Sequence, residues 1–378
     1  MMNLPKKLTK KLKLREETNS LRSLKLPSNL IDFSSNDYLG FAKSEVIFDK
    51  THQFLINRNI KQNGATGSRL LSGNHSLYNE VEGFLSDYHQ TESATIFNSG
   101  YDANIGFFSS IPQRGDVILY DEFIHASIRD GILLSNAKAF KFRHNDLDSL
   151  EEILKRIQQD NSDVYVVTES VFSMDGDSPD LIKMSQIIKN YRAFFIVDEA
   201  HAVGVFGAGL VQELNLQDAV FARIITFGKA LGSHGAAILG SEELQSYLVN
   251  FARSFIYTTG LSPHSLATIL MIYNEMLKQV QQNKLALSEN IHHFKEEVKR
   301  LKLNFIQSNS TIHCCVIPGN EKVKSISKKL QEKGFDVKAI LSPTVKENQE
   351  RLRFCLHSYN SKKEISDVLV LINDIMNN

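Results

Sequence analysis

The chain has 378 residues with an ordinary globular composition, 42% hydrophobic and 23% charged, which is enough for one large domain and a smaller one. Its 43 basic residues balance 43 acidic residues, so nothing in the charge indicates binding to nucleic acid or to an anionic membrane. Three cysteines without a C-x-x-C pair, and no apolar run near the roughly 20 residues of a membrane helix, predict a cytoplasmic protein without disulfides.

The N-terminus, MMNLPKKLTKKLKLREE, is rich in lysine but lacks the apolar core of a signal peptide. Leucines at helical spacing predict an amphipathic surface helix from about residue 7 to residue 25, which Pro27 would end. A short strand and a turn are predicted over 31–40, IDFSSNDYLG. In the glycine-rich stretch that follows at 63–74, Arg69 could meet an anion, although an ordinary solvent turn has the same composition.

Strands and helices alternate through the middle of the chain. Seven short runs rich in β-branched residues are predicted as strands, and helical segments separate most of them. This alternation predicts an α/β fold with a mainly parallel sheet covered by helices on both faces. Only a short turn separates the last two runs, so one of them should be antiparallel. The seven runs are 93–97, 116–120, 139–142, 163–169, 193–199, 223–227 and 235–240.

An extended helical pattern from His264 to about Leu301 leads out of this α/β region. The remaining sequence mixes two strand-like runs, CCVIPG and RLRFCLH, with two helical ones, SISKKLQEKG and EISDVLVLINDIM. We therefore expect an N-terminal arm over residues 1–45, a large domain over 46–281 and a smaller α+β C-terminal domain over 282–378.

Three of the predicted strands end in segments that could contribute to a site. In NSGYDAN, at 98–104, the backbone N–H groups of a helix start could bind an anion, although a plain glycine turn is about as common. His125 follows another strand end and could stack on a planar ligand, whereas an isolated histidine is more often structural. Glu169, Ser173 and Asp175 follow a third strand, where an acidic turn that caps the next helix is the plain alternative.

Two further strand ends bring an amine and a carboxylate to one edge of the sheet, outside which the ligands of open α/β sheets bind. Lys229 lies after one strand in a turn of small residues, FGKALGSHG, and Asp198 ends another strand with His201 close behind. A lysine in such a turn suits a Schiff base to an aldehyde cofactor, and an aspartate suits a pyridinium nitrogen. The pair therefore predicts an enzyme that uses pyridoxal 5'-phosphate (PLP).

Three other kinds of site fit the sequence poorly. A P-loop needs G-x-x-x-x-G-K-[ST], but residue 223 is Arg and Ala230 follows the lysine. No H-x-x-x-H or H-E-x-x-H spacing occurs at 198–201, so no metal is expected. No G-x-G-x-x-G follows the first strands, which disfavours a nicotinamide-dependent dehydrogenase.

The ordered motifs of the chain resemble those of the α-oxoamine synthases, a branch of the fold-type-I PLP-dependent transferases. The resemblance runs nearly end to end and rests on the blocks FSSNDYLG, GSRLLSGNH, NSGYDAN, VVTESVFSMDGD, VDEAHAVGVFG, TFGKALGSHGAA and LSPTVKENQERLRFCLHS. It implies that Lys229 binds the cofactor and moves the substrate's α-proton, while Asp198 pairs with the ring nitrogen. It also implies that His125 stacks on the ring and that His201 hydrogen-bonds its phenolic oxygen.

The resemblance implies further cofactor contacts and a shared site. The remaining cofactor contacts expected within one chain are Gly100, Tyr101, Glu169, Ser173 and Thr226. Thr258 and Thr259 are expected to reach the cofactor phosphate of the neighbouring subunit, so the active site would require a homodimer.

For the substrates, the resemblance favours the family members that condense L-alanine with pimeloyl-CoA or a pimeloyl-carrier thioester. The expected substrate contacts are Asn36 and Arg353 for the amino acid carboxylate, Arg22 and Thr344 for the acyl group, and His125. The segment PTVKENQ replaces the family's frequent PTVP-G and indicates a loop difference near the acyl group.

The cofactor motifs leave other functions open. Glycine C-acetyltransferase, serine palmitoyltransferase and 5-aminolevulinate synthase share nearly all of these residues and differ in the amino acid and the acyl chain. A catalytically silent homologue that acts as a binding subunit is a further alternative, but such a copy would usually have lost Lys229.

Overall fold

The computed structural model describes residues 4–24, 29–157 and 162–377, which form two compact units. The larger unit contains residues 36–173 and 177–285. The smaller unit combines residues 1–35 and 174–176 with residues 286–378, so the N-terminal segment clusters with the C-terminal part of the chain. Within the described ranges, no helix has the length and apolarity that crossing a membrane requires.

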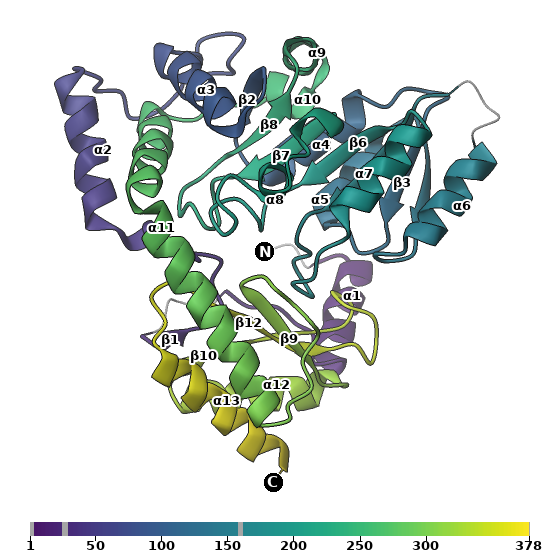
Figure 1. Ribbon diagram of the computed structural model, residues 1–378, viewed down its shortest axis with the longest axis vertical. Coiled ribbons are helices and arrows are strands. Elements are labelled where there is room, and N and C mark those ends of the chain that lie inside the picture. Colours follow the sequence, from purple (N-terminus) through teal and green to yellow (C-terminus); the bar gives the residue numbers. More distant parts are fainter. Residues whose placement is uncertain (1–3, 25–28, 158–161, 378) are drawn as a thin grey trace. The chain divides into compact units, whose positions relative to one another are not determined.

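The larger unit is built on a seven-stranded sheet (Figure 1). Its strands are β2 (Ser93–Phe97), β3 (Val117–Asp121), β4 (Lys138–Phe142), β5 (Val164–Glu169), β6 (Phe194–Asp198), β7 (Ala222–Thr226) and β8 (Ala236–Gly240). They pair in the order β2-β8-β7-β6-β5-β3-β4, and β8 alone runs antiparallel to its neighbours. The predicted α/β class and the mainly parallel sheet are confirmed, as is an antiparallel strand among the last two runs.

Helices cover both faces of this sheet because its strands are apolar on both sides. One face packs against α4 (Gly100–Ser110), α5 (Ala126–Leu134), α9 (Glu242–Phe251) and α10 (Arg253–Ile256). The other packs against α6 (Leu147–Ile157), α7 (Leu181–Asn190) and α8 (Leu210–Glu213). Successive residues of a strand alternate between the faces, so Asp198 lies on the same face as Ile196, which packs with α4 and α5.

Four further elements of the larger unit lie before β2 or between β6 and β7. They are η1 (Phe41–Lys43), α2 (Glu45–Asn57), α3 (Ser76–His89) and η2 (Gln217–Ala219). The long helix α11 (Pro263–Arg300) begins in the larger unit and ends in the smaller one.

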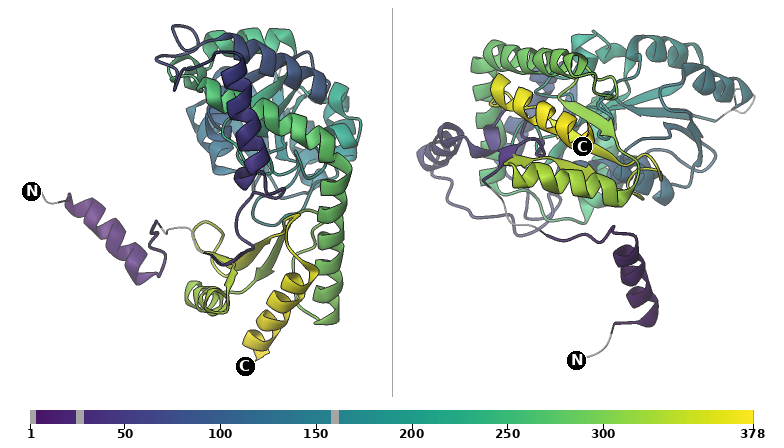
Figure 2. Two further views of the ribbon diagram at one scale, coloured as in Figure 1. Left: turned by 90° about the vertical axis from the view of Figure 1, so that its left-hand side faces the viewer. Right: turned by 90° about the horizontal axis from the view of Figure 1, so that it is seen from below.

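The smaller unit has a three-stranded antiparallel sheet and a separate two-stranded parallel pair. The first consists of β11 (Lys338–Ile340), β12 (Arg351–Cys355) and β9 (Ile312–Val316), and the second of β1 (Ile31–Asp32) and β10 (Phe335–Asp336). The helices α12 (Asn320–Glu332) and α13 (Lys362–Asn377) lie side by side (Figure 2) and share its apolar core.

The first helix is shorter than its leucine spacing predicts. Helix α1 (Lys6–Glu17) ends well before residue 25 and buries none of its side chains. Thr18 closes it, and Asn19 adopts the left-handed conformation (φ 51°), which an α-helix cannot continue through.

Candidate active site

Two neighbouring strands bring the predicted amine and imidazole together. Lys229 follows the end of β7 and His201 follows the end of β6. The Nζ of Lys229 lies 2.6 Å from the Nε2 of the buried His201. The turn that carries Lys229 is held by Gly232, which has φ +61° and leaves no room for a Cβ, since that atom would lie 2.2 Å from the backbone nitrogen of Ala42.

A fully buried tyrosine orients His201 from the other side. The hydroxyl of Tyr38 lies 2.8 Å from Nδ1 of His201 and donates to Oδ1 of Asn36 at 3.1 Å. One tautomer satisfies these contacts: Nδ1–H donates to the tyrosine oxygen, which leaves Nε2 to accept a proton of the Lys229 amine. Neutral His201 is then poised to hold or accept a proton beside Lys229.

Asp198 is buried, and each of its two carboxylate oxygens accepts one hydrogen bond. Its Oδ2 accepts from Nδ2 of Asn104 in α4 at 3.0 Å, and its Oδ1 accepts from the N–H of Ala200 at 2.9 Å. Asn104 also donates to Oγ of Ser127 at 3.0 Å, and that hydroxyl lies 2.7 Å from Nδ1 of His125. This network links Asp198 to His125, whose side chain is exposed and can present a ring face to a ligand.

The start of α4 provides backbone donors next to Thr226. Ser99 caps the N–H of Asp102 at 3.0 Å, and the N–H groups of Gly100 and Tyr101 lie in the same first turn, where a helix has no internal acceptors. A Cβ on Gly100 would lie 3.8 Å from the side chain of Thr226. Backbone N–H groups and a hydroxyl therefore meet at the ends of β2 and β7, as an anion site requires.

Two expectations for charged side chains are wrong. Asp175 does not cap the next helix, because Asp180 accepts from the N–H of Lys183 at the start of α7 and Asp175 forms a buried ion pair with Arg351. Arg69 is not free for an anion, since its guanidinium forms a two-pronged ion pair with Glu82. In both cases the partner is one that local sequence patterns do not reveal.

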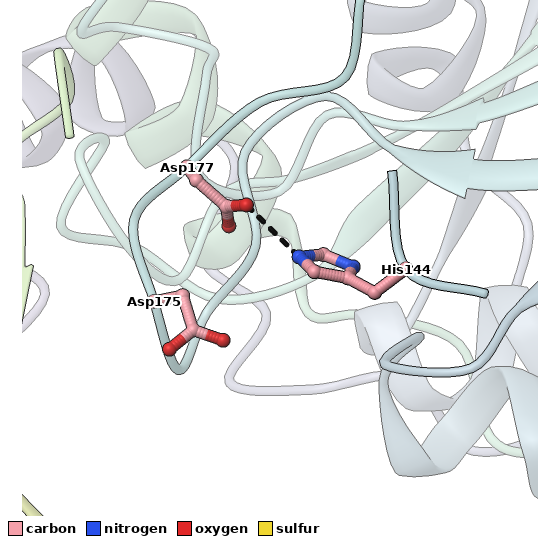
Figure 3. A group of neighbouring side chains, drawn as sticks. All are labelled: His144, Asp175 and Asp177. Atoms are coloured by element: carbon pink, nitrogen blue, oxygen red, sulfur yellow. Dashed lines mark hydrogen bonds and ion pairs between the residues drawn. The ribbon is translucent and has the colours of Figure 1, made fainter. Parts of the chain in front are cut away.

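His144 connects two carboxylates of the larger unit. Its Nδ1 lies 2.9 Å from Oδ1 of Asp121 and its Nε2 lies 2.9 Å from Oδ2 of Asp177, the second contact being drawn in Figure 3. Burial lowers the pKa of His144, but the hydrogen bonds to Asp121 and Asp177 outweigh it and raise the pKa to about 10. A histidine that donates from both nitrogens is a cation and has no lone pair for a metal.

The contacts of His144 with Asp121 and Asp177 should make the stability of the fold depend on pH. The folded pKa lies above the ordinary 6.5, so the contribution of His144 is fully present below about pH 6.5 and is lost as the pH rises toward 10. We expect His144→Gln to lower the melting temperature most at pH 6 and progressively less toward pH 10. The surface pair of His292 and Glu296 supplies a control in His292→Gln. A His144→Gln deficit that stays constant from pH 6 to pH 10 would contradict the assignment.

The other predicted site residues lie as follows. Glu169 ends β5 beside Asp198, and Ser173 is buried in the loop beyond it. Thr258 and Thr259 follow α10, where Asn98 donates to the hydroxyl of Thr258 at 3.0 Å and to the carbonyl of Thr259 at 2.6 Å. The remaining three belong to the smaller unit: Arg353 is buried in β12, and exposed Arg22 donates to the hydroxyl of Thr344 at 3.2 Å.

Three residues of this site went unassigned in the sequence: Tyr38, Asn104 and Ser127. The first two lie in the motifs SSNDYLG and NSGYDAN, and the third follows His125 by two positions. Each of them hydrogen-bonds to a side chain that is part of the predicted site, so its role becomes visible only when that partner is known. Proximity to a recognised motif is the signal that could have found them.

The residues of this edge fit PLP. Lys229 provides the amine for the aldehyde, and Asp198 provides a buried carboxylate for the ring nitrogen. The first turn of α4 and Thr226 provide donors for a phosphate, and the exposed His125 provides a stacking surface. The buried Oδ1 of Asn104 and Oε1 of Glu169 have no hydrogen-bond partner among the described residues, which leaves acceptors for a bound group.

Comparison with known proteins gives the family. Residues 28–370 match the family model of class I and II aminotransferases. The 8-amino-7-oxononanoate synthase of Emericella nidulans is 40% identical over 387 residues, covering 97% of this chain and 94% of that protein. The solved 8-amino-7-oxononanoate synthase from Francisella tularensis has a TM-score of 0.79 at 29% identity, with 92% of this chain and 98% of that one covered.

A second solved structure matches in fold alone. The serine palmitoyltransferase of Sphingomonas wittichii has a TM-score of 0.88, covers 100% of this chain and 98% of its own, and is 24% identical. The chain therefore belongs to the class I and II aminotransferase family and, within it, to the α-oxoamine synthases, which are PLP-dependent acyltransferases.

Proposed function

We propose that the protein condenses L-alanine with a pimeloyl thioester, the acyl donor being pimeloyl-CoA or a pimeloyl-carrier thioester. The products are 8-amino-7-oxononanoate, CO2 and the free thiol, the reaction of biotin biosynthesis. The Lys229 amine, 2.6 Å from His201 and beside the strand end of Asp198, carries the chemical part of this proposal. The choice of substrates is supported by the 40% identity to the Emericella nidulans enzyme over 97% of the chain.

Lys229 has two tasks in this reaction. Its amine would hold the cofactor through the aldehyde carbon and, once the amino acid has displaced it, would take the proton from the alanine Cα. His201 accepts a hydrogen bond from that amine and, with Tyr38 behind it, fixes the amine's direction. When bound, PLP supplies an electron-withdrawing ring that stabilises negative charge at Cα.

The other residues would hold the cofactor and the substrates in place. Asp198, fixed by Asn104, would keep a proton on the ring nitrogen, and the first turn of α4 with Thr226 would hold the phosphate. Asn36 and Arg353 would bind the alanine carboxylate, for which a guanidinium offers paired donors. Arg22 and Thr344, hydrogen-bonded to each other, would contact the acyl chain, and the site would be completed by Thr258 and Thr259 of a second subunit in a homodimer.

A visible absorption titration tests the proposal. The purified protein with PLP is titrated separately with L-alanine, glycine and L-serine, and the pimeloyl thioester is then added. We expect the largest spectral response with alanine and release of CO2, thiol and 8-amino-7-oxononanoate with the pimeloyl donor. A preference for glycine or serine would overturn the substrate assignment and move the protein to a sister enzyme. A protein that cannot be reconstituted with PLP would overturn the site itself.

A further inference from the structure

Two buried carboxylates end neighbouring strands of the large sheet. Glu169 is the last residue of β5, Asp198 is the last residue of β6, and the two are register partners in the parallel ladder. Adjacent strands lie about 4.8 Å apart, and residues in register point to the same face. Glu169 is 3% exposed and Asp198 is 4% exposed, so water screens neither of them.

The two carboxyl groups differ in the hydrogen bonds that they accept. Both oxygens of Asp198 accept hydrogen bonds, one from Asn104 and one from the N–H of Ala200, as suits an anion. Glu169 receives a hydrogen bond from the backbone N–H of His125, but its buried Oε1 has no partner among the described residues. An unpartnered oxygen suits a neutral carboxylic acid better than a buried anion.

We propose that the carboxyl groups of Glu169 and Asp198 hold one proton between them in the cofactor-free protein, and that this proton resides on Glu169. When a cationic ring nitrogen docks on Asp198, Glu169 releases the proton to solvent. Glu169 is thus a positioning residue: by losing its proton it adds a negative charge to the site when the positively charged ring nitrogen binds. The docking half of the proposal rests on the assignment of Asp198 to the ring nitrogen, whereas the shared proton does not.

The charges around Glu169 explain why it holds the proton in the cofactor-free protein and loses it when the ring nitrogen binds. Burial, the charge of Asp198 on β6 and that of Asp121 on β3 all raise the pKa of Glu169, which comes to about 8. Lys229 beyond β7 and the backbone N–H of His125 before α5 oppose this rise. A further positive charge beside Asp198 acts in the same sense as Lys229, so it favours loss of the proton.

The proton balance is simple. Below about pH 8 in the cofactor-free protein, Glu169 is a carboxylic acid beside the carboxylate of Asp198, so this pair of carboxyl groups has one negative charge. Docking of a protonated ring nitrogen adds one positive charge, and loss of the Glu169 proton to the buffer adds one negative charge. The site therefore gains a cofactor cation without a change in its net charge.

The shared proton is tested on cofactor-free protein by comparing wild type with Glu169→Gln, which keeps the shape and the neutral state. The pKa of Glu169 rises from 4.5 in an unfolded chain to about 8 in the fold, so wild-type stability is lost as the pH rises from about 4.5 to 8. The melting temperature of Glu169→Gln should therefore rise relative to wild type across that window and stay level above it. Parallel melting curves at all pH values would overturn the shared proton.

Asp198→Asn serves as the matched variant because it removes the like charge and keeps the size. Its stability-against-pH curve should bend at a lower pH than that of wild type, since the neighbouring carboxylate no longer raises the pKa of Glu169. A bend at the same pH would overturn the coupling between the two residues. An infrared band of a protonated carboxyl group that disappears in Glu169→Gln checks where the proton resides.

The release step is tested by calorimetry of PLP binding at pH 7 in buffers of different ionisation enthalpy. Wild type should release more protons per PLP bound than Glu169→Gln, by up to one, and the difference should vanish at pH 9. Equal release at pH 7 would overturn the docking step while the melting curves still report on the shared proton. Neither measurement involves alanine or a thioester, so both outcomes are separate from the substrate assignment.

Discussion

Replacing Lys229 by alanine should reduce turnover by at least about 10²-fold, because proton transfer by a positioned group alone contributes about 10²–10⁴-fold. The same change removes the amine that lies 2.6 Å from Nε2 of His201. PLP should still bind, since Asp198, the first turn of α4 and Thr226 are untouched. Product formation from alanine and pimeloyl thioester measures the loss, and equilibrium dialysis measures the retained binding.

The covalent role can be separated from the binding role. After borohydride reduction, mass spectrometry should find the cofactor attached to Lys229 in wild type and to no residue in Lys229→Ala. Lys183→Ala removes an exposed lysine that pairs with Asp180 on α7, and it should behave as wild type in both measurements. Near-normal turnover by Lys229→Ala, or attachment of the cofactor elsewhere in the chain, would refute the role given to this amine.

The sheet and the edge that carries the site could be predicted because their signals are local. A strand buried on both faces reads as a short apolar run, and a polar residue directly after it must lie at the carboxyl end of the strand. Asp198 and Lys229 both follow such runs, and the structure places them at the ends of adjacent strands β6 and β7. That one of the last two strands is antiparallel could be predicted because a short turn joins neighbouring strands only in antiparallel pairing, whereas a parallel pair needs a long crossover connection.

The sequence could not show contacts between residues that are far apart in the chain and are brought together only by folding. Asp175 and Arg351 are 176 positions apart and form a buried pair, and Tyr38 reaches His201 across 163 positions. No periodicity links such residues, and each has an ordinary local explanation. The end of α1 was missed for another reason: the leucine spacing continues past Glu17, whereas a single left-handed residue, Asn19, stops the helix.

A buried ion pair supports the loop that carries His201. Nε of Arg223 on β7 donates to Oε2 of Glu199 at 2.8 Å, and the pair is 2% and 0% exposed. The other arms of the guanidinium donate to the carbonyl oxygens of His89 at 3.0 Å and Ala208 at 2.7 Å. Oε1 of Glu199 accepts from the N–H of Val211 at 2.9 Å. The pair thus ties both ends of the segment from Glu199 to Val211 to the sheet.

Breaking this pair from either side should cost about 3–5 kcal/mol of unfolding free energy, because the remaining charge is buried without its partner. We expect this loss for both Glu199→Ala and Arg223→Ala in urea denaturation. The double replacement Glu199→Leu with Arg223→Met, which removes both charges and keeps the volume, should recover most of it. The exposed pair of Glu213 and Lys284 is the matched control, since Glu213→Ala should cost less than about 1 kcal/mol. If the double replacement were as unstable as the singles, the lost hydrogen bonds to the backbone of His89, Ala208 and Val211 would explain the effect rather than an unpaired charge.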